Sequence, residues 1–389
     1  MKLPSGEQFD VAVIGGGIQG AGAAQAAAAA GYHTLLIERD EWASATSRWS
    51  SKLIHGGLRY LESAQFNLVY HALQERQRLF RNAPALVKPV KFFIPIYRDT
   101  HRRPWQIRAG LSLYALFTGF NSQAFFRSLP RSEWSSLGGI RQDDLQAVFQ
   151  YWDGQTDDTA LTHAVVRSAQ QLQTIALEHS ELLSAKQSHD DFELTIKTHA
   201  TEWQCTARAV INATGPWVNA LLERCSPAPT ARALSYVKGT HIVLPPHNLP
   251  GIFYIEAPRD GRAVFVMPWQ GKTLVGTTEM EINTPTAAPS PTEIDYLIET
   301  VRAYFPDVDC TIMDSFAGVR VLPAGTGRAF SRARESIIAT FDADGAPLIS
   351  IYGGKLTTYR HTAEQVIALL RSRIGVKKAV ADTRTLPLI

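Results

Sequence analysis

The sequence predicts an α/β protein, α+β overall, in which an antiparallel sheet is inserted into a discontinuous domain built on parallel strands. The first observation is a strand–turn–helix–strand unit that opens the chain at residues 9–38. The second is the segment 234–278, where short β-type runs alternate with Pro and Gly turns, as in antiparallel sheets. The third is the return to a strand at residues 346–351 and a helix at 362–374. This order predicts one domain inserted into another.

The opening unit is predicted from hydrophobic pattern. Residues 9–16 are β-branched and apolar and end in glycine, which indicates a buried strand. Residues 18–30 are small and rich in alanine, which suits a helix packed closely on that strand. Residues 33–38 form the next apolar run, so the unit is a βαβ motif and predicts a Rossmann-like sheet.

The remaining elements follow from the same rules. We expect helices at residues 64–82, 159–177 and 294–304, a strand at 207–213, and four antiparallel strands at 241–244, 251–255, 263–267 and 273–276. Residues 83–125, rich in Pro, Arg and aromatic side chains, look like an excursion from the first domain. We therefore predict a first domain of residues 1–85, 145–228 and 312–389 and a second domain of residues 86–144 and 229–311.

Composition narrows the class of protein. The 389 residues suffice for about two domains, and 45% hydrophobic with 19% charged residues is the balance of a globular protein with a large core. A formal charge of +3 gives no indication of nucleic-acid binding. The motifs begin within ten residues of the N-terminus, so we expect no secretory leader, and no apolar run is long enough to span a bilayer. Three cysteines without metal-type spacing are expected to be reduced thiols in a cytoplasm, and we expect no metal site.

A glycine fingerprint follows the first predicted strand. Gly15, Gly17 and Gly20 form the pattern Gly-x-Gly-x-x-Gly around Ile18 and Gln19. These glycines allow a tight turn, close approach of a pyrophosphate, and close packing of helix on strand. Glu38 ends the second strand, where a carboxylate can accept hydrogen bonds from ribose hydroxyls. The context predicts dinucleotide binding, and the acid disfavours NADP, but the fingerprint alone does not separate FAD from NAD.

Five further blocks are more specific than the glycine pattern. They are Ala-Thr-Ser-Arg-Trp-Ser-Ser-Lys-Leu-Ile-His-Gly-Gly-Leu-Arg-Tyr-Leu at residues 45–61, Ile-Asn-Ala-Thr-Gly-Pro-Trp at 211–217, Lys-Gly-Thr-His at 238–241, Gly-Val-Arg at 318–320, and Gly-Gly-Lys-Leu-Thr-Thr-Tyr-Arg at 353–360. Together they resemble the FAD-dependent glycerol-3-phosphate dehydrogenase family, within the D-amino-acid-oxidase-like group of flavoproteins. The resemblance runs from about residue 9 to about residue 365 and favours FAD over NAD.

The resemblance and the residue types together give a set of cofactor contacts. Hydroxyl side chains can bond phosphate or flavin oxygens, and glycines let the backbone pass beside a flat ring. The expected FAD-binding residues are Gly15, Gly17, Ile18, Gln19, Gly20, Glu38, Thr46, Ser47, Ser51, Lys52, Leu53, His55, Gly57, Thr214, Gly215, Trp217, Gly354, Lys355, Leu356 and Thr357.

The resemblance implies that the substrate is sn-glycerol 3-phosphate. Hydride would leave C2 for flavin N5 and yield dihydroxyacetone phosphate. The dianionic head needs cationic partners, for which arginine has bidentate geometry. The expected substrate-binding residues are Arg59, Tyr60, His241, Arg320, Arg332 and Lys355, and the expected catalytic residues are His241, Arg320 and His55. His241 is our first choice for the base that takes the C2 hydroxyl proton, and His55 is the second.

Residues 88–120 combine six basic residues and one acidic residue with interleaved aromatics. This composition is typical of an interfacial anchor on anionic lipid, and the alternative is an ordinary domain edge with extended arginine stems. Bacterial members of the family are peripheral membrane enzymes that pass electrons to quinone, so we expect contact with the inner face of the cytoplasmic membrane. The sequence leaves the oligomeric state open.

Other functions stay open at the level of sequence. One alternative is a flavin oxidase of a small amine or hydroxy acid, which would need one carboxylate clamp and would produce hydrogen peroxide. Another is a non-enzymatic flavin-binding or nucleotide-binding module, against which Arg59, Arg320 and Lys355 argue. Family members usually continue with a further helical domain, whereas this sequence stops at Ile389, so a different phosphorylated polyol or a hydroxy acid is an alternative substrate.

Overall fold

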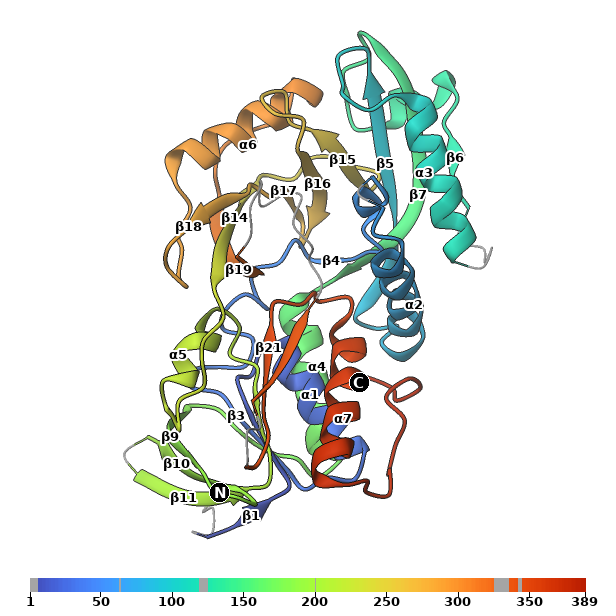
Figure 1. Ribbon diagram of the computed structural model, residues 1–389. Coiled ribbons are helices and arrows are strands. Elements are labelled where there is room, and N and C mark those ends of the chain that lie inside the picture. The colour runs from blue at the N-terminus through green and yellow to red at the C-terminus, as the bar shows by residue number, and fades with distance from the viewer. Residues whose placement is uncertain (1–5, 63, 119–124, 200, 325–335, 342–344) are drawn as a thin grey trace.

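Three sheets organise the chain. The computed structural model describes residues 6–62, 64–118, 125–199, 201–324, 336–341 and 345–389. A six-stranded sheet and a five-stranded sheet lie in one half of the molecule, and a ten-stranded sheet lies in the other (Figure 1). Both chain termini lie in the half that holds the six-stranded sheet.

The six-stranded sheet is the predicted parallel core. Its strand order is β20 (Ile337–Phe341), β21 (Leu348–Tyr352), β12 (Val210–Asn212), β2 (Val11–Ile14), β3 (Thr34–Ile37) and β8 (Ile175–Leu177). All pairs are parallel except β20 with β21. Helices α1 (Ile18–Ala29), α4 (Asp158–Gln171) and α7 (Tyr359–Ile374) lie side by side against it (Figure 1) and share one apolar core. Parallel strands with helices on their face form the expected Rossmann-like domain.

The helix predicted at residues 159–177 is wrong at its end. Helix α4 stops at Gln171, and the chain then forms strand β8, which pairs in parallel with β3. Gln173, between helix and strand, has a φ of +71°, which breaks the helical path. A short apolar run beside a helix carries too little periodicity to mark this change.

The five-stranded sheet was not predicted. It comprises β1 (Gln8–Phe9), β11 (Thr201–Ala207), β10 (Phe192–Thr198), β9 (Ser180–Gln187) and β13 (Cys225–Ser226). Its apolar side chains share a core with one face of the parallel sheet, opposite the helices. The other side chains of these strands are largely polar, so the hydrophobic signal is spread thinly over an alternating pattern.

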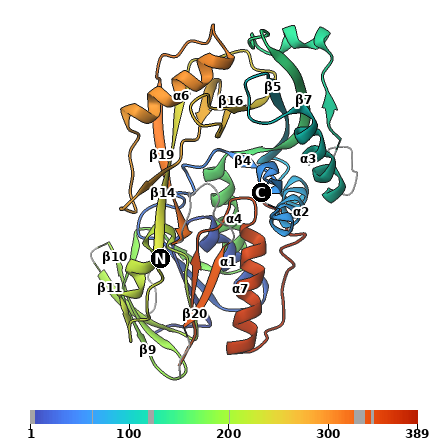
Figure 2. The same cartoon turned by 45° about the horizontal axis from the view of Figure 1, so that its top comes forward.

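The ten-stranded sheet contains the four antiparallel strands predicted between residues 241 and 276, which are confirmed. Its main path is β18 (Met280–Ile282), β14 (Leu234–Leu244), β17 (Lys272–Gly276), β16 (Ala263–Trp269), β15 (Ile252–Glu256), β5 (Val87–Tyr97), β7 (Leu145–Thr156) and β4 (Leu53–Ile54). Strand β19 (Asp314–Pro323) pairs with β14, and β6 (Arg127–Ser128) pairs with β7. Helix α6 (Pro291–Tyr304) lies over one face of this sheet (Figure 2).

Sheet membership divides the chain differently from the predicted domain boundaries at residues 145 and 312. Strand β7 pairs with β5 along its length, and β19 pairs with β14 from Asp314 to Pro323. Both strands therefore belong to the ten-stranded sheet, although the prediction placed them in the first domain.

The aromatic residues of segment 88–120 are mostly core residues. Phe92, Phe93, Tyr97 and Tyr114 are all buried, and Phe120 lies outside the described residues. Strand β5 has both faces covered at its C-terminal half, so its aromatics serve packing, contrary to the reading as lipid contacts. The exceptions lie on α3 (Pro104–Phe117), where Trp105 is 70% exposed and Phe117 is half-buried. Among the residues that the structure describes, no helix combines the length and apolarity needed to cross a membrane.

Candidate active site

One elongated cavity connects the two halves of the molecule. It begins at the turn between β2 and α1, passes the ends of β3 and β12, and reaches β14 and β19 of the ten-stranded sheet. Ligands of parallel α/β sheets bind at the carboxyl ends of the strands, where this cavity lies. Its lining includes most of the predicted site: Gly15, Gly17, Ile18, Gln19, Glu38, Thr46, Ser47, Ser51, Leu53, His55, Tyr60, Thr214, Gly215, Trp217, His241, Arg320, Gly354, Lys355, Leu356 and Thr357.

The glycine turn has no room for side chains. Gly15 has a φ of +108°, and a Cβ there would lie 2.6 Å from the carbonyl oxygen of Ala213. A Cβ on Gly20 would lie 1.8 Å from the carbonyl oxygen of Gly15. The first turn of α1 contains no acidic residue, so the partial positive charge at its N-terminus is not offset locally. The geometry is that of a phosphate cradle at a helix N-terminus.

Glu38 is held at the end of β3 by backbone groups. Its Oε2 accepts from the N–H of Gly16 at 2.6 Å, and its Oε1 accepts from the N–H of Asp40 at 2.8 Å. Each carboxylate oxygen has a second lone pair, so Glu38 can still accept from a ribose hydroxyl in the cavity. Glu38 therefore lines the cavity with hydrogen-bonding capacity left for a ribose of a bound dinucleotide.

The loop that contains His55 contacts the predicted flavin block. The N–H of His55 donates to Thr357 Oγ1 at 3.3 Å, and the N–H of Gly57 donates to His55 Nδ1 at 3.1 Å. Gln19 Nε2 donates to the carbonyl oxygen of Lys355 at 3.2 Å, which ties the same block to α1. Three segments that are far apart in sequence thus meet at one point of the cavity.

His241 lies on β14 at the other side of this point and is buried. Its Nε2 is 3.0 Å from Ser51 Oγ, and its ring stacks on Phe316 with centroids 4.9 Å apart. Among the described atoms, its Nδ1 is buried without a hydrogen-bond partner. Burial, together with the charges of Lys52 and Arg320, lowers the pKa of His241 to about 3. The imidazole is therefore neutral at pH 7.

Cationic and aromatic side chains close this end of the cavity. The ammonium group of Lys355 lies 3.8 Å from the centre of the Tyr60 ring. Arg320 Nη2 lies 3.9 Å from Glu279 Oε1, and a Cβ on Gly239 would come within 3.2 Å of the same nitrogen. The arrangement places Arg320 near the buried neutral imidazole of His241 and Lys355 in the same cavity, which suits a small anion that carries a hydroxyl group.

Four predicted residues lie behind the lining rather than in it. Gly20 packs α1 on the turn, and Gly57 has a φ of +73° directly after the His55 loop. Lys52 pairs with Asp158 at 2.8 Å in the interior, so its side chain supports the loop and does not face the cavity. Arg59 lies with its guanidinium 5.1 Å from the centre of the Tyr60 ring. Arg332 lies outside the described residues.

Several lining residues were not singled out from the sequence. Trp49 lies inside the block at residues 45–61, and Gly239 lies inside the block at 238–241, so the motifs contained the signal. Thr277 and Arg224 had no such signal, because they reach the cavity through the packing of distant elements. Asp158 was also missed: it accepts from Ser50 Oγ at 2.6 Å and binds Lys52, so it organises the loop.

The fold and the cavity define a dinucleotide-binding protein whose cavity continues from the glycine turn to His241 and Arg320. The family model described as FAD dependent oxidoreductase (DAO) matches residues 10–360. A glycerol-3-phosphate dehydrogenase of Synechocystis sp. is 36% identical over 98% of this chain and 73% of its own length. A D-erythritol 1-phosphate dehydrogenase of Brucella abortus is 34% identical over 92% of this chain and 73% of its own length. A crystal structure of glycerol-3-phosphate dehydrogenase from Bacillus halodurans with FAD superposes with a TM-score of 0.76 at 27% identity, over 99% of this chain and 68% of that one.

The chain belongs to the FAD dependent oxidoreductase family, in the branch that contains the glycerol-3-phosphate dehydrogenases. It is a flavoprotein enzyme with FAD as its cofactor. The residues present fit this cofactor. The turn, which has no room for a Cβ at Gly15 or Gly20, would hold the pyrophosphate, Glu38 would accept from the ribose, and the far end of the groove holds the buried imidazole of His241.

Proposed function

We propose that the protein oxidises sn-glycerol 3-phosphate to dihydroxyacetone phosphate and that its electrons pass to quinone. The observation that supports this most is the convergence of Arg320, Lys355, Tyr60, His55 and His241 at the end of the dinucleotide groove. The relatives named glycerol-3-phosphate dehydrogenase support the same substrate class. FAD supplies the acceptor for the hydride that leaves C2 of the substrate.

The cations bind and orient the substrate. Arg320 offers a planar fork for two phosphate oxygens, and Lys355 adds a point charge from the opposite strand-to-helix connection. Tyr60 provides an aromatic wall beside Lys355. Binding the phosphate at a fixed distance from the flavin block places C2, two bonds from the ester oxygen, in one orientation.

His241 is the proposed base for the C2 hydroxyl. A neutral imidazole can accept that proton. Burial is the main cause that lowers the pKa of His241 to about 3, and the charges of Lys52 and Arg320 lower it further, so a dianionic substrate beside Arg320 would offset the contribution of these charges. His55 is the second candidate. Its Nδ1 accepts from Gly57, so the neutral ring carries its proton on Nε2, which favours donation over acceptance there.

A dye-linked assay tests the substrate. We expect rapid dye reduction with sn-glycerol 3-phosphate and little with glycerol, because glycerol has no phosphate group to bind Arg320 and Lys355. The relative that acts on D-erythritol 1-phosphate makes this longer polyol the informative competitor. If erythritol 1-phosphate were turned over faster, it would be the preferred substrate in place of glycerol phosphate, and the assignment of the phosphate-binding residues would stand. Peroxide formation from an amino or hydroxy acid, without turnover of either phosphate, would favour the oxidase instead.

We also propose peripheral contact with a membrane through the surface of helices α2 (Phe66–Asn82) and α3, defined by Phe66, Tyr70, Trp105, Leu116 and Phe117. Phe117 packs against both Phe66 and Tyr70, with ring centres 6.4 and 6.2 Å apart. Trp105 and Leu116 are 70% and 55% exposed. The exposed basic residues Arg103 and Arg108 of the same segment would favour anionic lipid.

Vesicle binding tests this surface. We expect sedimentation with phosphatidylglycerol vesicles and weaker binding to phosphatidylcholine vesicles. Trp105→Ala is expected to weaken vesicle binding several-fold, because this largely exposed aromatic side chain is free to insert at the lipid surface and contributes little to the folded core. The matched control is Trp203→Ala, on β11 in the other half of the molecule. Equal binding of both variants to both lipids would contradict the proposed surface.

A further inference from the structure

A chain of buried polar groups runs from the backbone of the His55 loop into the second half of the molecule. The N–H of Gly56 donates to the Tyr114 hydroxyl at 2.7 Å, and this hydroxyl donates to Asp153 Oδ2 at 2.6 Å. Arg76 Nη1 donates to Asp153 Oδ1 at 2.6 Å. Tyr114, Asp153 and Arg76 are 3%, 1% and 0% exposed, so the whole chain is shielded from water.

The chemistry of these groups fixes the direction of every hydrogen bond. Arg76 is a cation and only donates, so Asp153 accepts from it, and an ionised Asp153 accepts from Tyr114 as well. The Tyr114 hydroxyl donates its single proton to Asp153, so it can only accept the hydrogen bond from the N–H of Gly56. Arg76 also donates to the carbonyl oxygen of Trp152 at 3.1 Å, which anchors the ion pair to β7.

The loop has little stiffness of its own at this point. Gly56 and Gly57 follow His55 directly, and two successive glycines leave the backbone many conformations. A Cβ on Gly56 would come within 2.5 Å of both the Tyr114 hydroxyl and a methyl group of Leu73. The backbone is therefore pressed against Tyr114, and no side chain fits between them.

The loop is held by hydrogen bonds on two sides, by Tyr114 at Gly56 and by Thr357 at His55. The backbone of His55 meets Thr357 at a longer donor distance of 3.3 Å. Immediately before His55, Ile54 of β4 pairs with Gly154 of β7, the residue next to Asp153. The His55 loop is thus connected to β7 in two ways. Ile54 pairs with Gly154 in the sheet, and Gly56 is linked to Asp153 through the Tyr114 hydroxyl.

We propose that Tyr114, held by Asp153 and Arg76, is a positioning residue that fixes the His55 loop against the flavin site. This inference rests on the proposed function, because it assigns the His55 loop to the active site. Without the Tyr114 hydroxyl, the N–H of Gly56 and Oδ2 of Asp153 both lose a buried partner, and the loop gains freedom. The imidazole of His55 would then sample orientations that do not support turnover.

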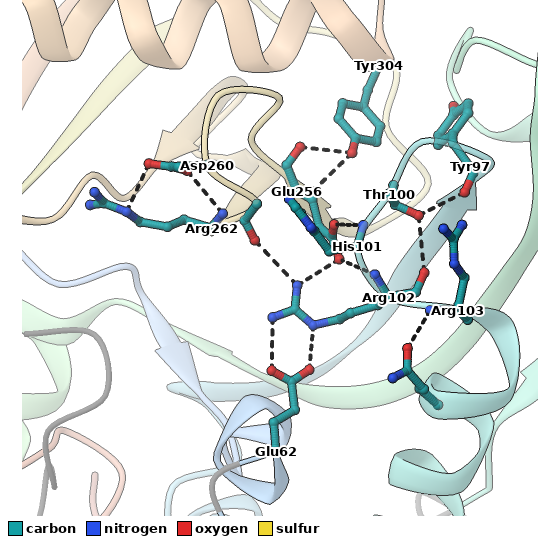
Figure 3. A network of polar contacts seen from close by, with 12 residues as sticks. Glu62, Tyr97, Thr100, His101, Arg102, Arg103, Glu256, Asp260, Arg262 and Tyr304 are labelled. Carbon is teal, nitrogen blue, oxygen red and sulfur yellow. Dashed lines mark hydrogen bonds and ion pairs between the residues drawn. The ribbon is translucent and has the colours of Figure 1, made fainter. Parts of the chain in front are cut away.

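The test compares Tyr114→Phe with Tyr304→Phe. The Tyr304 hydroxyl also accepts a backbone N–H, from Glu256 at 3.2 Å, and donates to a backbone carbonyl, that of Glu256 at 2.8 Å (Figure 3). Tyr304 is the last residue of α6, and its side chain lies in an apolar cluster that includes no residue of the His55 loop. Both variants delete one buried hydroxyl with two hydrogen bonds, so a merely structural effect should be similar in the two proteins.

Two readouts separate positioning from stability. In Tyr114→Phe we expect the Gly56 amide to exchange with deuterium at least about tenfold faster, and kcat for sn-glycerol 3-phosphate to fall roughly tenfold with a smaller change in KM. In Tyr304→Phe both quantities should match the wild-type enzyme. Equal effects of the two variants on exchange and kcat would overturn the inference.

The outcomes also separate this inference from the proposed function. Fast exchange of Gly56 in the wild-type enzyme would overturn the positioning role without any variant. Selective loosening of the loop in Tyr114→Phe, in a protein that turns over no glycerol phosphate, would support the restraint and contradict the proposed substrate. Selective loosening with unchanged kcat, in an enzyme that does turn over glycerol phosphate, would contradict the positioning role.

Discussion

Replacing Gly20 with alanine probes how closely the cofactor cradle is packed. The added Cβ would lie 1.8 Å from the carbonyl oxygen of Gly15 and 3.3 Å from the Cβ of Ala213. Both neighbours are backbone or short side chains, so the helix and the turn must separate by about 1 Å. Overpacking of this kind costs about 1–3 kcal/mol of stability. The displaced turn moves the helix N-terminus from the pyrophosphate, for which we expect roughly a 100-fold loss of FAD affinity, about 2.7 kcal/mol.

The matched control is Gly22→Ala on the same helix. Its Cβ would lie 2.5 Å from Cδ2 of Tyr359, a side chain of α7, so the strain falls between the helices and away from the turn. Flavin fluorescence titration of the two apoproteins measures the affinity, and thermal unfolding without FAD measures the stability. We expect both variants to unfold at a lower temperature than the wild-type protein, but only Gly20→Ala to bind FAD more weakly. Wild-type FAD affinity in Gly20→Ala would refute the assigned cradle.

Two further variants test the substrate pocket and the closing helix. Arg320→Ala is expected to lower kcat/KM for glycerol phosphate about 100-fold, on the order of 3 kcal/mol, with unchanged FAD content, and an undiminished kcat/KM would exclude a phosphate contact. Glu364 on α7 accepts from Arg360 and Arg384; partial burial opposes ionisation, yet these hydrogen bonds bring the pKa of Glu364 from 4.5 to about 2. Its ion pairs therefore stabilise the protein above pH 4.5 and are lost as the pH falls toward 2, so Glu364→Gln should cost about 2 kcal/mol at pH 7 and progressively less across that interval. A pH-independent difference in unfolding temperature would contradict this assignment.

Local sequence rules predicted the parts of the fold that local chemistry determines. The turn at Gly15 and the acid at Glu38 were identifiable because each conformation or position admits few residue types. The resemblance of five blocks then placed His55, His241 and Arg320 in one site, and all three line one cavity. The strand order could not be predicted by such local rules. The pairing of β8 with β3, for example, joins residues that are more than a hundred positions apart in the sequence.

The errors came from side chains whose partners are distant in sequence. Lys52 was predicted to bind FAD, but its ammonium group pairs with Asp158 in the interior. Arg102 counted as one of the basic surface residues, whereas it is bound by Glu256 at 2.7 Å and also by Glu62 (Figure 3). Tyr114 read as one of several aromatic lipid contacts, yet it is buried and hydrogen-bonded to Gly56. Composition cannot show whether a charge or a ring faces water or a partner.

Anaerobic reduction of the bound flavin tests the central claim most directly. The purified yellow protein is mixed with sn-glycerol 3-phosphate in the absence of oxygen and of any added acceptor, and the visible absorbance of the flavin is followed. The arrangement of Arg320, Lys355 and His241 at the end of the dinucleotide groove predicts rapid bleaching that saturates with substrate, with dihydroxyacetone phosphate formed in equal amount to reduced flavin. A protein that stays yellow with this substrate, yet bleaches with dithionite, would contradict the proposed substrate while keeping the flavoprotein.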